Sequence, residues 1–247
     1  MILKFELLSI SFFFILLSLS SCKESASPKH SSNSINKIMP LGASRVEGKH
    51  PRYESFRYPL WKMLKENGWT FDLIGTQLDR ASYPRLGKET FDNDHEGRNG
   101  YTSRQIMEGL PSWLEKAGTP DVVLVSAPGG NDVLRLNTSV KDIVSNYSNI
   151  IDQLQEKNPA VKIVIEKIAP ARLSFMDERM TVAFQALHER VGELARKKTS
   201  SKSVVVAIDM HTGFSDDMLA DEVHYNQKGA EFIATRYYQV LSGMLEK

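Results

Sequence analysis

The 247-residue sequence contains one cysteine, almost no net charge and a single long hydrophobic run. Lysine and arginine (31) balance aspartate and glutamate (30), and the formal charge of +1 provides no general attraction to nucleic acid. With 41% hydrophobic and 25% charged residues, the composition excludes a mainly disordered, collagenous or disulfide-stapled chain. The length is sufficient for one large hydrophobic core or two small ones.

The hydrophobic run extends from Leu7 to Leu19, after the basic Lys4. Its length is typical of a secretory signal and too short for a membrane-spanning helix. The residues Leu19-Ser20-Ser21-Cys22 resemble the lipobox of bacterial lipoproteins, in which the cysteine is lipidated and cleavage makes it the new N-terminus. The resemblance implies a signal peptide over residues 1–21 and a lipidated Cys22. The alternative is an ordinary cleaved signal followed by an incidental thiol.

Lipidation of Cys22 leaves the mature chain without a free thiol, which removes cysteine-nucleophile and thiolate-zinc chemistry. Residues 22–36 are rich in serine, so we expect a flexible tether there, followed by one folded domain over residues 37–247. These segments predict a protein of the bacterial cell envelope, at the periplasmic or outer-membrane face. Its only membrane attachment is then the N-terminal lipid.

Short segments rich in valine, isoleucine and leucine alternate with amphipathic segments along the rest of the chain. The predicted strands are residues 35–41, 70–75, 121–127, 161–168 and 203–210. The predicted helices are residues 55–67, 102–116, 139–157, 178–198 and 227–245. This alternation predicts one doubly wound, flavodoxin-like α/β domain, with a five-stranded parallel sheet and helices on both faces. No sequence repeat or second linker indicates another domain.

Functional sites in open α/β sheets form at the carboxyl ends of the strands. Ser44 follows the first predicted strand and His224 follows the fifth, so His224 is the best-placed base for the serine hydroxyl. Asp221, three residues earlier, can orient the imidazole and stabilise the imidazolium. The sequence therefore predicts a triad of Ser44, Asp221 and His224. Donors for a developing oxyanion are the backbone N–H groups of Ser44 and Gly100 and the side-chain amide of Asn131.

These residues occur in four short blocks that resemble the SGNH (GDSL-type) hydrolase superfamily. The blocks are Gly42-Ala43-Ser44, Gly100, Gly130-Asn131-Asp132 and Asp221-Glu222-Val223-His224. The resemblance implies a serine esterase that needs no metal and no organic cofactor. The segments IMPLG (38–42), YPLWKML (58–64) and HEGRNGYTSRQI (95–106) are most similar to carbohydrate-active members, many of which remove acetyl groups. The implied partner is a small-molecule or polysaccharide ester; the sequence does not indicate an oligomeric state.

The chain departs from this superfamily at Ala43, where the usual residue is an aspartate that braces the nucleophile loop through hydrogen bonds. A methyl group makes no such bonds, so the loop must be held in another way. We expect Arg45 to be a solvated loop charge, with contact to a polar or anionic substrate as the alternative. Two other functions stay open: a lipase or thioesterase of the same fold, and a catalytically silent glycan-binding envelope protein.

Other polar clusters have simpler interpretations. Residues 92–97 begin like a calcium loop, but the twelfth position is Ser103 and lacks the bidentate glutamate. We expect His95 and Glu96 to shape the rim of the site or brace the glycine block, and Asp209 to be a structural carboxylate. His50 and His188 are expected at the surface, Trp61 and Trp69 in the core or an interface, and Trp113 in the core or at the cleft edge. Tyr53, Tyr83, Tyr101 and Tyr225 are the aromatic residues considered for a carbohydrate platform, and none is assigned.

Overall fold

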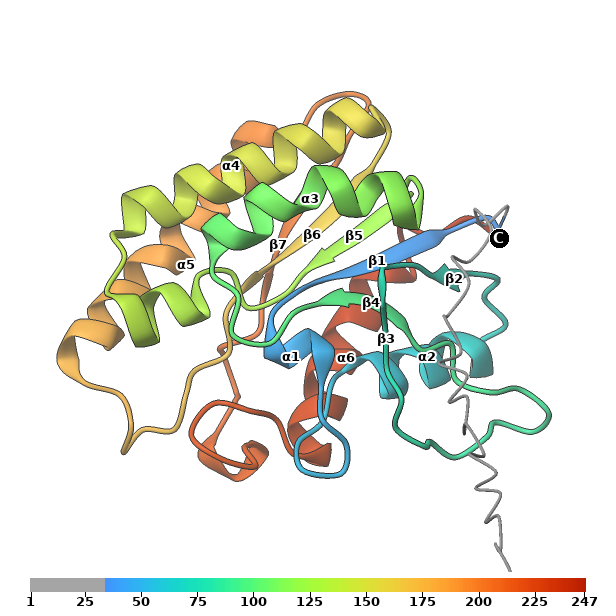
Figure 1. Cartoon of the computed structure of the whole chain (residues 1–247), viewed down its shortest axis with the longest axis horizontal. Helices are drawn as coiled ribbons and strands as arrows, with labels where there is room; N and C mark the ends of the chain where they lie inside the picture. The colour runs from blue at the N-terminus through green and yellow to red at the C-terminus, as the bar shows by residue number, and fades with distance from the viewer. Residues whose placement is uncertain (1–33) are drawn as a thin grey trace, which may run out of the picture.

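The computed structural model describes residues 34–247, and a twisted seven-stranded sheet lies at its centre (Figure 1). The spatial order is β3-β4-β1-β5-β6-β7, with β2 paired to β1. All pairs are parallel except β3 with β4. The strands are β1 (Lys37–Gly42), β2 (Asp72–Leu73), β3 (Gln77–Leu78), β4 (Asp94–Gly97), β5 (Val122–Val125), β6 (Lys162–Lys167) and β7 (Val205–Asp209). The predicted signal peptide, Cys22 and most of the predicted tether lie outside the described residues.

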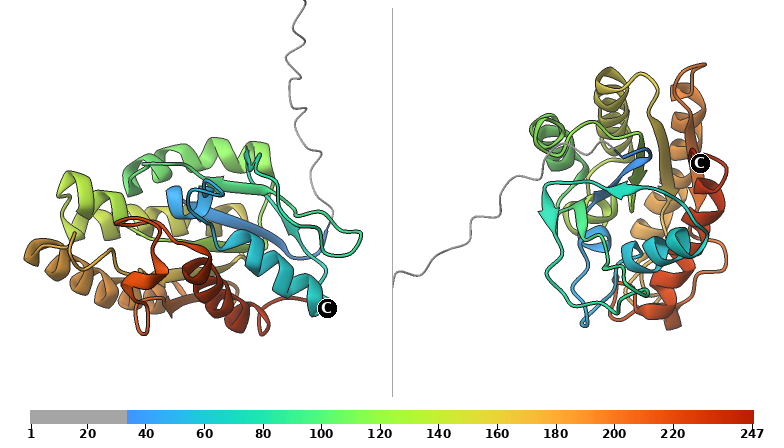
Figure 2. Two further views of the ribbon diagram at one scale, coloured as in Figure 1. Left: turned by 90° about the horizontal axis from the view of Figure 1, so that it is seen from below. Right: turned by 90° about the vertical axis from the view of Figure 1, so that its right-hand side faces the viewer.

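Helices cover both faces of the sheet, as the sequence predicts (Figure 2). One face carries α3 (Ser103–Ala117), α4 (Val140–Lys157) and α5 (Glu178–Lys198), and the other carries α2 (Arg57–Glu66) and α6 (Gln227–Leu241). Successive strand residues alternate between the two cores, which is why the buried strands are hydrophobic without interruption. In β5, Val123 and Val125 face the α3–α5 side, and Val122 and Leu124 face the α2–α6 side.

The strand count differs from the prediction, because seven strands form where five were expected. β2 is only two residues long, although residues 70–75 read as a full strand. On the side of β1 that faces away from β5, the sheet continues through β4, a strand that the sequence does not predict. The four residues of β4, Asp-His-Glu-Gly, are all buried. Glu96 is satisfied there by hydrogen bonds from Thr76 and Arg98 rather than by apolar neighbours. A hydrophobic pattern does not detect a strand whose burial rests on hydrogen bonds.

The structure places several side chains whose position the sequence left as an expectation. Trp61, Trp69 and Trp113 are all buried in the core. Asp209 is structural: partial burial opposes its ionisation, but hydrogen bonds from Thr212 and His211 outweigh this and hold its pKa at about 2. The expectation that His188 lies at the surface is wrong, because its ring is half-buried. Its Nε2 lies 3.1 Å from the carbonyl oxygen of Ile168. Within residues 34–247, no helix has the length and apolar character needed to cross a membrane.

The buried imidazole of His95 in β4 generates a testable pH dependence of stability. Burial, with the nearby charges of Arg57 and Arg98, lowers its pKa from 6.5 to about 2. Below pH 6.5 the unfolded chain binds a proton that the folded protein does not, so stability is complete above that pH and declines as the pH falls toward 2. This one group contributes a slope of up to about 1.4 kcal/mol per pH unit.

We expect the variant His95→Gln to lose this contribution. The free energy of unfolding, measured with denaturant at several pH values between roughly 7 and 4.5, then falls less steeply in the variant than in the wild type. The comparison uses the difference between the two slopes, since carboxylates titrate in both proteins. Parallel slopes would contradict a neutral, buried His95.

Candidate active site

Ser44, His224 and Asp221 form one hydrogen-bonded row at the carboxyl end of β1. Ser44 is the first residue of the short helix α1 (Ser44–Glu47), and the other two lie in the loop before α6. Nε2 of His224 is 3.0 Å from Oγ of Ser44, and Nδ1 is 2.7 Å from Oδ2 of Asp221. The loop that follows β7 thus brings the predicted triad residues together across 180 positions of sequence.

The carboxylate of Asp221 is held in its ionised form. Partial burial opposes ionisation, but the backbone N–H groups of Val223 and His224 and the His224 ring donate to it and lower its pKa. A charged acceptor at Nδ1 keeps the proton on that nitrogen and leaves Nε2 free to accept from the serine hydroxyl. The arrangement is suited to proton transfer from Ser44.

Tyr53 supports the other side of the imidazole. Its ring stacks on that of His224, with ring centroids 4.0 Å apart and an interplanar angle of 15°. Tyr53 is only 5% exposed, so it is a packing surface for the base rather than an open carbohydrate platform. The sequence around it carries no motif that indicates this contact.

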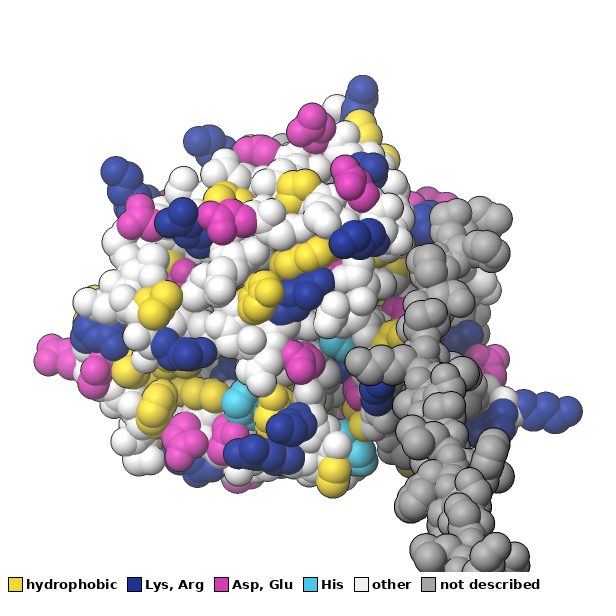
Figure 3. All heavy atoms as spheres, in the orientation of Figure 1, with side chains coloured by type: hydrophobic (Ala, Val, Ile, Leu, Met, Phe, Trp, Pro, Cys, Tyr) yellow, Lys and Arg dark blue, Asp and Glu magenta, His cyan; other side chains and the backbone are white. Residues whose placement is uncertain are grey.

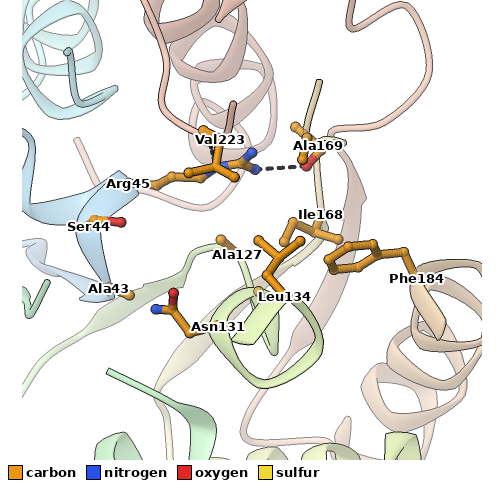
Figure 4. Close-up of a pocket in the computed structure, with 12 residues that line it drawn as sticks. Ala43, Ser44, Arg45, Ala127, Asn131, Leu134, Ile168, Ala169, Phe184 and Val223 are labelled. Atoms are coloured by element: carbon orange, nitrogen blue, oxygen red, sulfur yellow. Dashed lines mark hydrogen bonds between the residues drawn. The ribbon is translucent and has the colours of Figure 1, made fainter. Parts of the chain in front are cut away.

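Arg45 is buried, and the prediction of a solvated loop charge is wrong. Its guanidinium donates to the carbonyl oxygens of Ala169 (2.7 Å) and Val223 (2.8 Å), both labelled in Figure 4. It also donates to the carbonyl oxygen of Pro170 (3.1 Å) and lies 4.7 Å from the ring centroid of Tyr225. These bonds tie the nucleophile loop to the loops after β6 and around His224. Arg45 therefore anchors the loop in which Ala43 replaces the bracing aspartate.

A second buried arginine holds the other end of α1. Arg57, from α2, donates to the carbonyl oxygens of Val46 (2.6 Å) and Glu47 (2.7 Å) and pairs with Asp79 at 2.7 Å. The four-residue helix that carries Ser44 is thus fixed by guanidinium groups at both ends. The sequence offers no signal for either role, since each depends on carbonyl groups that only the folded chain presents.

The predicted oxyanion donors do not all line the cavity beside Ser44. Asn131 lines the same cavity as Ser44 and donates one amide hydrogen to the carbonyl oxygen of Tyr101 at 2.8 Å, so its second amide hydrogen is available (Figure 4). Gly100, at φ 75°, does not line this cavity but directly precedes Tyr101. Among residues 34–247, the backbone N–H groups of Ser44 and Gly100 have no hydrogen-bond acceptor.

The cavity beside Ser44, called here the acyl cavity, is small and mostly apolar. Its volume is about 40 Å³, which is room for about three water-sized groups. Ala127 lies in the left-handed region at φ 49°, and its N–H donates to the buried Glu166 at 2.7 Å, which holds this wall in place. The apolar lining is completed by Ala43, Leu134, Ile168, Ala169, Ala171, Phe184 and Val223.

Comparison with known proteins identifies the family of the chain. The sequence model of the GDSL-like lipase/acylhydrolase family matches residues 65–232, which include Asn131, Asp221 and His224. The chain belongs to this family. It is an ester hydrolase, and the predicted resemblance to the SGNH (GDSL-type) hydrolase superfamily is confirmed. No curated protein matches the chain significantly in sequence.

Solved structures extend the similarity over most of the chain. A carbohydrate esterase of family 3 from Talaromyces cellulolyticus is 28% identical, with a TM-score of 0.73 over 84% of this chain and 97% of its own. A family 3 carbohydrate esterase from Clostridium thermocellum is 27% identical, with a TM-score of 0.66 over 85% of this chain and 98% of its own. An acetyl xylan esterase at 17% identity and a TM-score of 0.61, covering 83% of this chain and 99% of its own, shares the fold.

The variant Arg45→Met tests the anchoring of the nucleophile loop. It leaves three carbonyl groups without their buried donor, so we expect a loss of about 2–4 kcal/mol in the free energy of unfolding. We also expect kcat for ester hydrolysis to fall by about tenfold or more, since Ser44 and His224 lose their alignment. Denaturant unfolding and steady-state kinetics measure the two effects.

Arg190→Met is the matched control, because Arg190 is exposed and its only ion pair within residues 34–247 is with Glu193 in the same helix. We expect it to change stability by less than about 0.5 kcal/mol and to leave kcat unchanged. A destabilised Arg45→Met protein with wild-type kcat, measured well below its unfolding transition, would show that Arg45 does not position the site.

Proposed function

We propose that the protein is a serine esterase in which Ser44 is the nucleophile. The observation that carries this proposal is the continuous hydrogen-bonded row from Ser44 Oγ through His224 to Asp221. His224 takes the hydroxyl proton as Ser44 attacks the ester carbonyl, and Asp221 stabilises the imidazolium. The N–H groups of Ser44 and Gly100 and the amide of Asn131 are the proposed donors to the oxyanion.

The second half of the reaction reverses these proton transfers. His224 gives its proton to the leaving alcohol, and an acyl group remains on Ser44. Water, deprotonated by His224, then attacks this acyl-enzyme and releases the carboxylic acid. The steps that follow from the side chains present require no metal or organic cofactor.

We propose short-acyl, mainly acetyl, esters on carbohydrate as the substrates. The acyl cavity of about 40 Å³ is large enough for an acetyl group and small for a long alkyl chain, and Ile168 and Phe184 belong to its apolar lining (Figure 4). Similar structures support the same choice: two are family 3 carbohydrate esterases, and another is an acetyl esterase variant with an acetate ion. A lipase-like or thioesterase-like specificity would need a longer apolar groove at this point.

A catalytically silent glycan-binding protein is the alternative suggested by Ala43. Arg45 weakens that alternative, because it supplies the anchoring that Ala43 does not provide. A fluorophosphonate probe distinguishes the two functions, since covalent labelling requires an activated serine. Labelling that is absent in the wild type while glycan binding is retained would favour the silent protein.

Hydrolysis of p-nitrophenyl esters from acetate to long-chain acyl groups tests the reaction and the acyl size together. We expect activity to be highest on acetate, to fall steeply beyond butyrate and to be lost in Ser44→Ala. Activity that rises with chain length would move the assignment to a lipase. Activity that survives in Ser44→Ala would contradict the nucleophile.

The variants Leu134→Ala and Leu136→Ala form a matched pair that tests whether the acyl group binds in the acyl cavity. Leu134 lines the cavity, whereas Leu136 is 63% exposed two residues later. We expect Leu134→Ala to raise the ratio of butyrate to acetate hydrolysis, because it enlarges the cavity, and Leu136→Ala to leave this ratio unchanged. Equal ratios in both variants would show that the acyl group binds elsewhere.

We also propose that a lipid on Cys22 anchors the enzyme in the bacterial cell envelope, at the periplasmic or outer-membrane face. The support is the lipobox-like Leu19-Ser20-Ser21-Cys22 and the serine-rich segment behind it. Full-length protein should fractionate with membranes and incorporate labelled fatty acid, whereas Cys22→Ala should do neither. Membrane association of Cys22→Ala without any lipid would indicate an uncleaved signal instead.

A further inference from the structure

A second cavity lies on the opposite side of α1 from the acyl cavity. We call it the α1–β3 pocket; its volume is about 370 Å³ and it is lined by residues 47–50, residues 77–81 and His95. This volume falls within the range of about 300–1,000 Å³ that is typical of small-molecule sites. None of the proposed catalytic steps uses this pocket.

Sheet topology explains why the two cavities flank Ser44. β1 lies between β5 and β4, so the loop after β1 has the ends of β5 and β6 on one side and β4 and β3 on the other (Figure 1). The acyl cavity uses Ala127 and Ile168 from the first side. Glu47, which lines the α1–β3 pocket, is one helical turn, about 5 Å along the axis, from Ser44. The α1–β3 pocket is therefore near enough to Ser44 for the alcohol part of an ester to reach it when the acyl group occupies the acyl cavity.

The carboxylates of the α1–β3 pocket are already occupied by hydrogen-bond donors. Asp79 accepts from Arg57 at 2.7 Å, from the hydroxyl of Tyr83 at 2.8 Å and from the N–H of Ala81 at 2.9 Å. Glu47 accepts from the backbone N–H of Asn99. Asp79 therefore offers little acceptor capacity to a ligand, whereas the other carboxylate oxygen of Glu47 accepts no hydrogen bond from the described residues.

Donors in the same pocket remain unused. Nδ1 of His95 accepts the N–H of Gly97 at 3.0 Å, which places the proton of the neutral ring on Nε2. His95 is 2% exposed and lines the pocket, and Nε2 has no acceptor among residues 34–247. Lys49 and Arg80 also line the pocket, and neither forms an ion pair within the described part of the chain.

The excess of hydrogen-bond donors is confined to the α1–β3 pocket and does not extend over the surrounding surface. Positive and negative side chains are interspersed over the face of the molecule that carries α1 (Figure 3), in keeping with the net charge of +1. A pocket with the Nε2–H of His95, two exposed cations that form no ion pair within the described residues and a fully hydrogen-bonded Asp79 complements a ligand that brings an anionic acceptor. The carboxylate of a uronic acid is an acceptor of this kind on a sugar ring.

We propose that the α1–β3 pocket binds the carboxylate of a uronic acid in the alcohol part of the substrate. This inference rests on the proposed esterase function for the position of the ester, and it narrows the substrate class to esters of acidic polysaccharides. Lys49 and Arg80 neutralise the carboxylate, and Nε2–H of His95 donates a hydrogen bond to the sugar.

The test compares two synthetic esters that differ at one position, mono-acetylated methyl glucuronoside and mono-acetylated methyl glucoside. We expect the wild type to favour the glucuronoside in kcat/KM by about tenfold, and the preference to weaken as salt is added. The double variant Lys49→Gln/Arg80→Gln should bring the ratio close to one. Lys88→Gln, which removes an exposed cation outside the pocket, is the control and should keep the wild-type ratio.

A binding measurement separates failure of this inference from failure of the proposed function. Full-length Ser44→Ala protein, titrated with methyl glucuronoside and with methyl glucoside, reports recognition without chemistry. Tighter binding of the glucuronoside, lost with Lys49→Gln/Arg80→Gln added, supports the pocket even if no ester is hydrolysed. Equal binding and equal kcat/KM for the two sugars would overturn the uronate site while leaving an esterase for neutral sugars.

Discussion

Two buried guanidinium groups hold the four-residue helix on which the site depends. Arg45 ties the start of α1 to the loops after β6 and around His224, and Arg57 binds the carbonyl groups at its end. Burying a positive charge is costly unless its donors are satisfied, and here backbone carbonyls and Asp79 satisfy them. The fixed planar fork of arginine suits this task because it reaches several carbonyl oxygens at once.

This clamp accounts for a nucleophile loop without its usual aspartate. In the SGNH resemblance that aspartate braces the loop, and Ala43 makes no hydrogen bond through its side chain. Arg45, two residues further along the chain, performs the bracing, and its guanidinium lies over the ring of Tyr225. The loop is therefore stabilised by charge–carbonyl contacts to two other loops, and a change in either of them is transmitted to Ser44.

The position of β1 inside the sheet divides the site into two halves with different chemistry. Toward β5 and β6 the lining is apolar and narrow, which suits a small acyl group. Toward β4 and β3 it is wider and polar, because β4 is buried through hydrogen bonds to His95 and Glu96 rather than through hydrophobic packing. One strand order thus places a small apolar cavity on one side of Ser44 and a larger polar pocket on the other.

Local sequence is enough to predict elements with a strong hydrophobic period and residues with distinctive chemistry, because both are local properties. It predicts five helices, four buried strands and four candidate site residues, namely β1, β5, β6 and β7, and Ser44, Asn131, Asp221 and His224. Local sequence does not predict that DHEG is a strand, that Arg45 is buried or that Tyr53 stacks on His224. Each of these depends on partners far away in the chain, such as Thr76 for Glu96 and Ala169 for Arg45, and such partners leave no pattern in the sequence around the residue itself.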